Sequence, residues 1–414
     1  MLIGTNLTYT KEYNLRIVHE TIRLHGPLSR ADIARRTELT VQTVSNLVRQ
    51  LVDLNLVRED GRRQEGRGAP SVTLSLNANG GFAVGLDLDR DHLTGVLVDL
   101  TGQVRERVGM DLHFPSPEDA LDKLTRVVHE LVERHNLALD QLWGVGIGIP
   151  GPMHQDPDGR DTYVMNPKAF PGWHNVPIAD ALKERLNLPV FIENNASAAA
   201  MGERQYGSGQ EFDTFFYIYF GSGLGGGLVL RGQPFDGFTG NSGEIGYLPT
   251  QNLSNGPVDD RPHVGLHFYL PRLFERLQSD GLDVSRPEDL KQLFDDGNPR
   301  LMRWIEEGAE HLTMLSLAVE YLIDPEAIFF GGRLPDNVLE ELMKRVGALL
   351  PDRRITGKVA GPQQLLARAG VDAAALGVAT LPFYEFAAPA PQVLLKQGDA
   401  SGAARLTPPR SAAG

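Results

Sequence analysis

Apolar positions in the first 76 residues repeat at the spacing of short amphipathic helices. Three apolar residues about one turn apart mark the first helix: Leu15, Val18 and Ile22. This helix is expected to end near Gly26-Pro27, because proline disfavours a helical residue before it. Ser29 stands three residues before Asp32, which is the spacing of a capping box and predicts a short second helix.

A third helix, which Thr40 can cap, has two contrasting faces. Its apolar face carries Val44, Leu47, Val48 and Leu51. Its opposite face carries Gln42, Asn46 and Arg49, flanked by Thr43 and Ser45. Amide and guanidinium groups are the side chains that read base edges in the major groove, and hydroxyls reach phosphates. The pattern therefore predicts a helix that recognises DNA.

Residues 57–76 predict two strands around a tip rich in glycine and arginine, in which Val72, Leu74 and Leu76 alternate strictly. The arginines of this wing, which suit phosphates or the minor groove, are Arg62, Arg63 and Arg67. The alternative is a three-helix module for protein interaction with a solvated charged loop. Turn spacing, capping, the polar face and the wing together favour DNA binding. The stretch resembles the winged helix-turn-helix heads of bacterial repressors.

Beyond residue 81 the pattern changes to alternating strands and helices, after a segment at 77–81 that we expect to be a hinge. Strands are expected at 85–88, 93–100, 145–149, 189–192, 214–220 and 327–330. Helices are expected at 117–135, 178–187, 197–206, 301–323 and 335–350. This alternation is typical of an α/β domain.

The charges divide unevenly between these two regions. The net charge of -13 argues against DNA binding if it is averaged over the chain. Residues 1–76, however, hold eleven Lys and Arg against eight Asp and Glu, and the rest of the chain holds 29 against 45. Because an acidic body repels the duplex, only the head is expected to contact DNA.

Composition narrows the class further. The chain has no cysteine, which excludes disulfides, thiol nucleophiles and cysteine-ligated zinc. No window approaches the roughly 20 consecutive apolar residues of a membrane span. The first residues also lack the pattern of a signal peptide. We therefore expect a cytoplasmic protein with no membrane contact.

Six glycine-rich or polar motifs occur in order along the body. They are GVGIGIPGP (144–152), NPKAFPGW (166–173), IENNASAAAMGE (192–203), FGSGLGGGLVLRG (220–232), GNSGEIGY (240–247) and FFGGRL (329–334). In this order and spacing they resemble the ROK family of repressors, open reading frames and sugar kinases. The resemblance implies an actin-like ATPase fold, with two α/β lobes around a cleft, and the head implies the repressor branch. We expect a winged helix-turn-helix domain at 1–76, a sugar-kinase-like domain at 82–386 and a disordered tail at 387–414.

One residue decides how much chemistry the resemblance implies. Kinases of the family use the aspartate of an E-N-D-A motif to accept the proton from the attacking hydroxyl. This chain reads Glu193-Asn194-Asn195-Ala196, so an amide stands at the base position. Asn195 can bind a hydroxyl but cannot take its proton. Loss of a general base typically lowers the rate of the catalysed step by about 10²–10⁴. The alternative is that a neighbouring carboxylate has replaced the base.

The sequence also opposes nucleotide binding. Kinases of the family place a Gly-Gly-Thr-type turn after their first strand to admit the phosphates of ATP, whereas this chain has Asp87-Leu88-Asp89-Arg90-Asp91. The bulk and negative charge of this segment oppose a polyphosphate, but Arg90 offsets part of that charge, so nucleotide binding is disfavoured and not excluded. A second glycine-rich segment comprises Gly221, Ser222, Gly223, Gly225 and Gly226. It can cradle a phosphate or serve only as a tight turn, and both alternatives stay open. No cofactor is expected.

Family members commonly carry a structural zinc on one histidine and three cysteines. Tyr247 stands where that histidine would be, and no cysteine follows. His263 and His267 alone are too few ligands, so we expect no metal.

The residues that the family directs at sugar hydroxyls are retained in part. They are Glu193, Asn194, Asn195 and Glu244. Gly151 and the loop from Asn166 to Trp173 are expected at the mouth of the pocket. The alternative for Glu244 is a helix-capping carboxylate. The altered zinc segment reshapes the pocket, so the ligand need not be glucose or N-acetylglucosamine.

These observations favour a transcriptional repressor that binds a double-stranded operator as a homodimer or homotetramer and senses a sugar or sugar derivative. Two other hypotheses remain open. One is an ATP-dependent sugar kinase with a regulatory DNA-binding head. The other is a regulator that needs no ligand and uses its body only to oligomerise.

Overall fold

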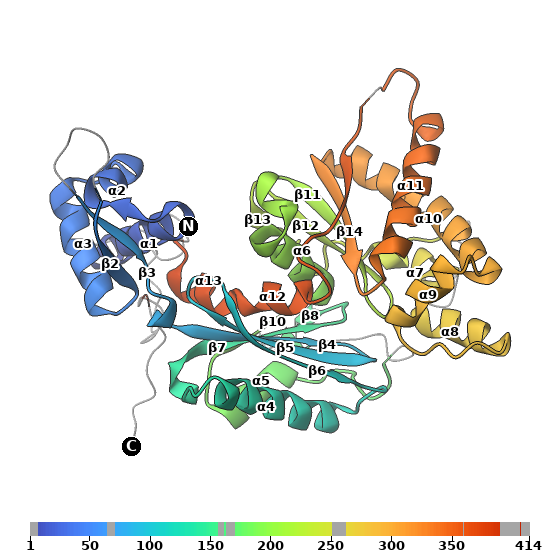
Figure 1. The fold of residues 1–414 in the computed structure, drawn as a ribbon, viewed down its shortest axis with the longest axis horizontal. Helices are drawn as coiled ribbons and strands as arrows, with labels where there is room; N and C mark the ends of the chain where they lie inside the picture. The colour runs from blue at the N-terminus through green and yellow to red at the C-terminus, as the bar shows by residue number, and fades with distance from the viewer. Residues whose placement is uncertain are drawn as a thin grey trace.

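The computed structural model describes residues 7–63, 71–155, 161–162, 170–250, 262–358, 360–389 and 406. A small head lies beside a larger body, whose two lobes are each built on a five-stranded sheet (Figure 1). No helix within the described part of the chain is long and apolar enough to cross a membrane.

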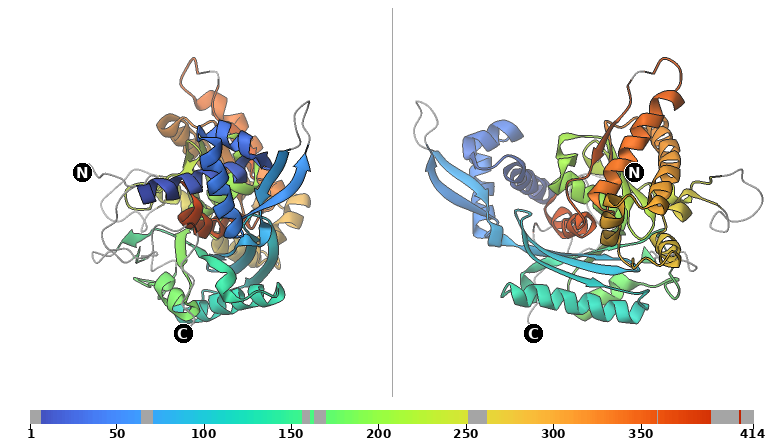
Figure 2. Two further views of the ribbon diagram at one scale, coloured as in Figure 1. Left: turned by 90° about the vertical axis from the view of Figure 1, so that its left-hand side faces the viewer. Right: turned by 45° about the vertical axis from the view of Figure 1, so that its right-hand side comes forward.

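The head is a winged helix-turn-helix, as the sequence predicts. Its helices are α1 (Leu7–His25), α2 (Arg30–Thr37) and α3 (Val41–Asp53), and its strands are β1 (Leu28–Ser29), β2 (Val57–Arg63) and β3 (Ser71–Leu76). The capping box of Ser29 and Asp32 starts α2, and the Thr40 hydroxyl accepts the Thr43 N–H at the start of α3. The short β1 makes the wing a three-stranded sheet of order β1-β3-β2, and the wing extends away from the body (Figure 2).

The expected hinge at 77–81 is instead packed between head and body. Asn77 donates to the Leu56 and Asn55 carbonyls of the head at 2.9 Å each. A side chain at Gly81 would collide with the Trp143 indole of the body. Trp143 and Leu100 are buried in the same apolar cluster as the core of the head. The expectation of a free hinge was therefore wrong, because glycine here permits close packing rather than motion.

The first lobe has sheet order β10-β7-β4-β5-β6. Its strands are β4 (Phe82–Leu88), β5 (His92–Asp99), β6 (Val104–Asp111), β7 (Leu142–Ile149) and β10 (Val190–Asn194). Helices α4 (Pro117–Arg134) and α5 (Ile178–Leu186) cover one face, and α12 (Ala373–Ala379) and α13 (Leu381–Ala387) lie on the other (Figures 1 and 2). The short strands β8 (His154–Gln155) and β9 (Asp161–Thr162) pair separately.

The second lobe has sheet order β13-β12-β11-β14-β15. Its strands are β11 (Phe215–Phe220), β12 (Leu224–Leu230), β13 (Gln233–Pro234), β14 (Ala327–Gly332) and β15 (Gln363–Leu366). Its helices are α7 (Val264–His267), α8 (Leu270–Ser279), α9 (Leu290–Asp295), α10 (Pro299–Ile323) and α11 (Asp336–Arg353). Every residue of β11 is buried, because alternate side chains pack toward α6 and toward α10 and α11.

Helix α6 (Asn195–Tyr206) packs against α12 and joins the lobes. A side chain at Gly377 would collide with the Ala198 carbonyl of α6, and one at Gly146 would collide with the Val378 carbonyl above β7. These backbones touch directly, so α6, α12 and β7 form one rigid block.

This block also reaches the head. Helix α13 continues directly from α12, and Arg16 of α1 donates to the Glu385 and Ala388 carbonyls at its end, both at 3.1 Å. Arg23 of α1 donates to Gln205 Oε1, near the end of α6, at 3.3 Å. The head is thus fixed to the elements that run back to the cleft.

The tail expected from residue 387 lies almost wholly outside the described residues. Ala387 still belongs to α13, and Leu406 is buried in the cluster shared with the head. Leu406 therefore departs from the expectation of a disordered tail, because its apolar side chain is packed in this cluster.

Candidate ligand cavity and nucleic-acid interface

Helix α3 presents the residues predicted to read bases. Gln42, Asn46 and Arg49 are exposed on one face, while the opposite face is buried in the head core. The hydroxyl groups beside them have local partners. Thr40 and Thr43 hydrogen-bond each other at 2.8 Å, and the Ser45 hydroxyl donates to the Val41 carbonyl. Hydroxyl oxygens can still accept further bonds, so these residues remain able to meet a phosphate.

The wing positions are described only in part. Arg62 and Arg63 end β2, where their backbones pair with Val72 and Ser71 of β3. The ladder shifts register between Glu59 and Arg62, a bulge that bends the strand toward its tip. Arg67 lies outside the described residues.

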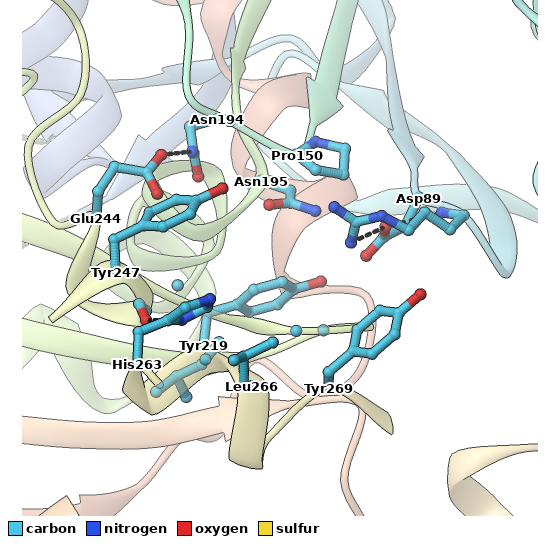
Figure 3. A pocket seen from close by; sticks show the side chains of 18 residues that line it. Asp89, Pro150, Asn194, Asn195, Tyr219, Glu244, Tyr247, His263, Leu266 and Tyr269 are labelled. Atoms are coloured by element: carbon cyan, nitrogen blue, oxygen red, sulfur yellow. Dashed lines mark hydrogen bonds and ion pairs between the residues drawn. The ribbon is translucent and has the colours of Figure 1, made fainter. Parts of the chain in front are cut away.

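A cavity of about 270 Å³ opens between the two lobes, which is near the lower end of the size of small-ligand sites. Of the residues predicted to bind ligand, Gly151, Asn194, Asn195 and Glu244 line it. Its wall also includes residues that the sequence reasoning did not assign to ligand contact: Pro150, Tyr219, His263, Leu266 and Tyr269. In Figure 3, Asn195 lies between the Asn194–Glu244 pair and Asp89.

Asn194 and Glu244 form the polar end of the cavity. The Asn194 side-chain amide donates to Glu244 Oε1 at 3.1 Å, and Asn194 Oδ1 accepts the Ala196 N–H at the start of α6. Burial raises the pKa of Glu244 to about 7. Near neutral pH this carboxyl can therefore both donate and accept, as a sugar hydroxyl requires. Glu244 is not the capping carboxylate of the alternative, since no side-chain cap bond is present there.

Asn195 begins α6 at the centre of the cavity. Two carboxylates of the β4 end, Asp87 and Asp89, have hydrogen-bond partners. Asp87 Oδ2 lies 3.1 Å from His92 Nε2, whereas its Oδ1 is buried with no partner among the described residues; Asp87 does not line the cavity. Asp89 does line it, but its carboxylate accepts three hydrogen bonds from Ser222 and Arg90. These bonds hold the Asp89 carboxylate against Ser222 and the Arg90 main chain.

Two predicted ligand residues lie elsewhere. Glu193 is not among the residues lining the cavity, and its Oε1 accepts the Asn194 N–H at 2.8 Å. Burial and then the charge of Asp236 raise the pKa of Glu193 to about 8. In this arrangement Glu193 thus holds the main chain at Asn194 and is not part of the cavity wall.

Trp173 was wrongly placed at the mouth of the pocket. Its side chain is 1 % exposed, stacks on Phe170 and donates from its indole nitrogen to the Pro115 carbonyl at 2.8 Å. Trp173 instead completes the core of the first lobe, because burying its large apolar surface is more favourable in free energy than exposing it to solvent. Asn166 lies outside the described residues.

The glycine-rich segment divides into a turn and a strand. Gly221, Ser222 and Gly223 make the turn between β11 and β12, in which the Gly221 N–H donates to the Gly223 carbonyl. Gly225 and Gly226 lie within β12, opposite Tyr219 and Ile218. These two glycines therefore belong to the β11–β12 ladder and not to the turn, although Gly225 also lines the cavity. In the turn itself, the Ser222 N–H donates to Asp89.

The histidines of the altered zinc segment have backbone partners. His263 Nδ1 lies 2.8 Å from the Gly246 carbonyl, and His267 Nε2 lies 2.9 Å from the Trp304 carbonyl. Within the described ranges, one group has the spacing of metal ligands: Asp89, Asp91 and His92. Burial alone would lower the pKa of His92, but hydrogen bonds to Asp87 and Asp91 raise it to about 10.

Comparison with known proteins follows the same division into head and body. Residues 83–383 match the ROK family, and residues 6–67 match the MarR family. A xylose repressor of Bacillus spizizenii is 28% identical over 388 residues, which cover 92% of this chain and 97% of that protein.

Two solved structures share the fold. A ROK family transcriptional regulator described as a homologue of the E. coli MLC protein has a TM-score of 0.70 at 23% identity, covering 90% of this chain and 99% of its own. A ROK family glucokinase of Streptomyces griseus, in complex with glucose and AMPPNP, has a TM-score of 0.60 at 24% identity, covering 73% of this chain and 99% of its own. The latter corresponds in extent to the body without the head.

Proposed function

The chain belongs to the ROK family, and from this membership we propose that it is a cytoplasmic DNA-binding repressor that senses a saccharide without phosphorylating it. The observation that carries the proposal is the combination of an exposed polar face on α3 with a cleft lined by Asn195, an amide at the position where the resemblance to family kinases implies a proton acceptor. The relatedness to a xylose repressor supports carbohydrate as the effector class.

The cavity supports binding without transfer. Asn194, Asn195 and Glu244 offer the amide and carboxyl groups that hydroxyl-rich ligands require. Two carboxyl groups reach this cavity: Asp89 bonds Ser222, and Glu244 accepts from the Asn194 amide. These contacts favour the sensor over the rival kinase with a regulatory head.

The route from cleft to head is direct. Helix α6 begins at Asn195 in the cavity and ends beside Arg23 of the head, and β7 runs from the buried Trp143 to Pro150 in the cavity wall. Effector-dependent lobe closure that moves either element must therefore move α1. We propose that this displacement changes the spacing of paired heads and weakens operator binding.

Operator binding with and without sugars tests the proposal. An operator is selected from random duplexes, and its affinity is measured by fluorescence anisotropy with xylose, glucose, N-acetylglucosamine and related sugars. At least one saccharide should weaken binding by about 5- to 150-fold, the usual range of effector coupling. If no saccharide changes operator affinity, the ligand-independent regulator is the better description.

A single head offers a small interface, so we propose that a homodimer or homotetramer binds a pseudo-palindromic site. Light scattering of the protein alone and with operator should give at least two chains per duplex. One chain per operator would contradict this assembly.

Alanine at the reading face is expected to relax sequence preference. Gln42→Ala and Arg49→Ala should each lower discrimination against mismatched operators by about 1–2 kcal/mol, because both side chains are exposed on the face of α3 that we propose reads the bases. Arg345→Ala on α11, remote from the head, is the matched control. Unchanged preference in both head variants would show that α3 does not read bases.

The head–body interface is expected to weaken in acid because of His19. This side chain is 1 % exposed, neither ring nitrogen has a hydrogen-bond partner among the described residues, and burial lowers its pKa to about 4. The charged groups facing it are Glu20, Arg23 and Arg16 of α1, and Glu385 of α13 lies beside Arg16.

The fold favours the neutral His19 ring, so the unfolded chain takes up a proton at a higher pH than the folded one. The stabilisation that the neutral ring gives the fold is therefore complete above pH 6.5 and is lost as the pH falls toward 4. Between pH 7 and 5 the free energy of unfolding should fall by roughly 1–2 kcal/mol more in the wild type than in the His19→Leu variant. Chemical denaturation at each pH measures both values. Equal losses in both proteins would assign the acid sensitivity to other groups.

A further inference from the structure

A buried carboxylate at the edge of the cavity makes one of the contacts between the two lobes. Asp89 follows β4 in the first lobe, and Ser222 lies in the β11–β12 turn of the second. The Ser222 N–H donates to Asp89 Oδ2 at 3.2 Å, and the Ser222 hydroxyl donates to Oδ1 at 2.8 Å. Asp89 is 2 % exposed and Ser222 is 1 % exposed, so water competes little with these bonds.

Arg90 completes this arrangement. Its backbone N–H donates to Asp89 Oδ1 at 2.7 Å, and its guanidinium donates to the Ser222 hydroxyl at 2.6 Å. The Ser222 hydroxyl therefore accepts from Arg90 and donates to Asp89. Main-chain amide, hydroxyl and guanidinium are the donors that a turn of this kind would otherwise offer to a phosphate.

The bonds among Asp89, Arg90 and Ser222, called the Asp89 bridge below, lie beside Asn195 in the cavity. Gly221, Gly223 and Asp89 line the same cavity as Asn195, and Figure 3 places Asp89 on the side of Asn195 away from Asn194 and Glu244. A phosphate attached to a saccharide at the polar end, or offered to its hydroxyl by a nucleotide, must enter this region.

The same bridge separates two cavities. The second cavity, of about 420 Å³, is lined by Ser222, Arg286 and Arg333, and Arg90 belongs to the walls of both. Phosphoryl transfer requires donor and acceptor to meet in line in a continuous space. Asp89, Arg90 and Ser222 stand between the two spaces.

We propose that Asp89 is a specificity-determining residue: its carboxylate holds the anion position of the Gly221–Gly223 turn, so the cleft accepts neutral saccharides and rejects phosphorylated sugars and nucleotides. The inference rests on the proposed function, whose effector class it narrows. An entering phosphate would have to displace Asp89 from Ser222 and would leave two like charges together in a buried site. A neutral sugar needs no such displacement.

Removal of this one charge tests the inference. Binding of Mg-ATP and of glucose 6-phosphate is measured by isothermal titration calorimetry for the wild type, Asp89→Asn and Asp111→Asn. Asp111 lines the second cavity but makes no bond to Ser222, so its variant removes the same charge from the same lobe. Asp89→Asn should bind at least one probe about tenfold or more tightly than the wild type, with no such gain in Asp111→Asn.

Three outcomes would overturn the inference. They are wild-type binding as tight as that of Asp89→Asn, an equal gain in Asp111→Asn, and no gain in a folded Asp89→Asn. Should Asp89→Asn fail to fold, the affinities of the wild type decide. The inference then requires that a saccharide bind the wild type at least about tenfold more tightly than the phosphate ester of the same saccharide does. Failure of every sugar to affect the operator would contradict the proposed function, whereas the Mg-ATP comparison would still decide the role of Asp89.

Discussion

Replacing Glu244 with alanine is expected to abolish the response of operator binding to the effector while leaving operator binding itself intact. Glu244 lies in the cavity wall and accepts a hydrogen bond from the Asn194 amide at 3.1 Å. Its removal therefore deletes one contact to the ligand and leaves the Asn194 side chain, a second ligand-binding group, without the bond that orients it. Hydrogen bonds to a charged or partly charged group are worth about 1.5–3 kcal/mol, or roughly 10- to 150-fold in affinity. The head makes none of these contacts, so its affinity for DNA should not change.

Calorimetry with the active saccharide and anisotropy with the operator measure the two properties separately. Glu340→Ala, an exposed position on α11, is the matched control and should behave as the wild type. If Glu244→Ala keeps full sugar affinity, the polar end of this cavity is not the effector site. If it loses operator affinity without any sugar, Glu244 acts on the fold rather than on the ligand.

Arg16→Gln is expected to separate sugar binding from DNA release. Arg16 donates to two carbonyls at the end of α13, and α13 continues from the helix that packs on β7 and α6. Loss of these bonds should loosen the head from the body, so the coupling of about 5- to 150-fold between saccharide and operator should fall close to one. Saccharide affinity measured by calorimetry should stay at the wild-type value.

Because Arg16 is buried, Arg23→Gln provides a second test at the same interface. It removes the bond to Gln205 at the end of α6 from a more exposed position. Arg345→Gln, whose ion pair with Glu341 lies on α11, controls for loss of a guanidinium. Thermal unfolding confirms that each variant is folded. Full effector response in folded Arg16→Gln and Arg23→Gln would exclude this interface as the route of coupling.

The sequence predicts well wherever local chemistry decides the structure. The capping box at Ser29, the cap at Thr40 and the two faces of α3 follow from spacing alone, because neighbouring residues supply both partners. Those strands and helices of the body that the sequence predicts lie near their observed bounds, whereas it predicts no counterpart of β6, β12, β15, α8, α9, α12 and α13. The spacing of apolar residues along each predicted element agrees with the face that the element buries, so the pattern predicts the element correctly.

Errors arise where distant segments meet. The 77–81 segment has hinge-like composition, yet Trp143 packs against it and removes its freedom. Trp173 has the character of a binding aromatic, yet it bonds the Pro115 carbonyl and completes a core. The Asp89–Ser222 contact joins residues 133 positions apart, so sequence shows the extra charge but not the donor that holds it.

The absence of sugar phosphorylation is the central claim, and turnover measures it most directly. Purified protein is incubated with Mg-ATP and the saccharide that releases the operator, and ADP formation is followed in a coupled assay. The account predicts a rate no higher than that of Asn195→Ala under the same conditions. Saccharide-dependent ADP formation that Asn195→Ala abolishes would contradict it and identify the chain as an active kinase.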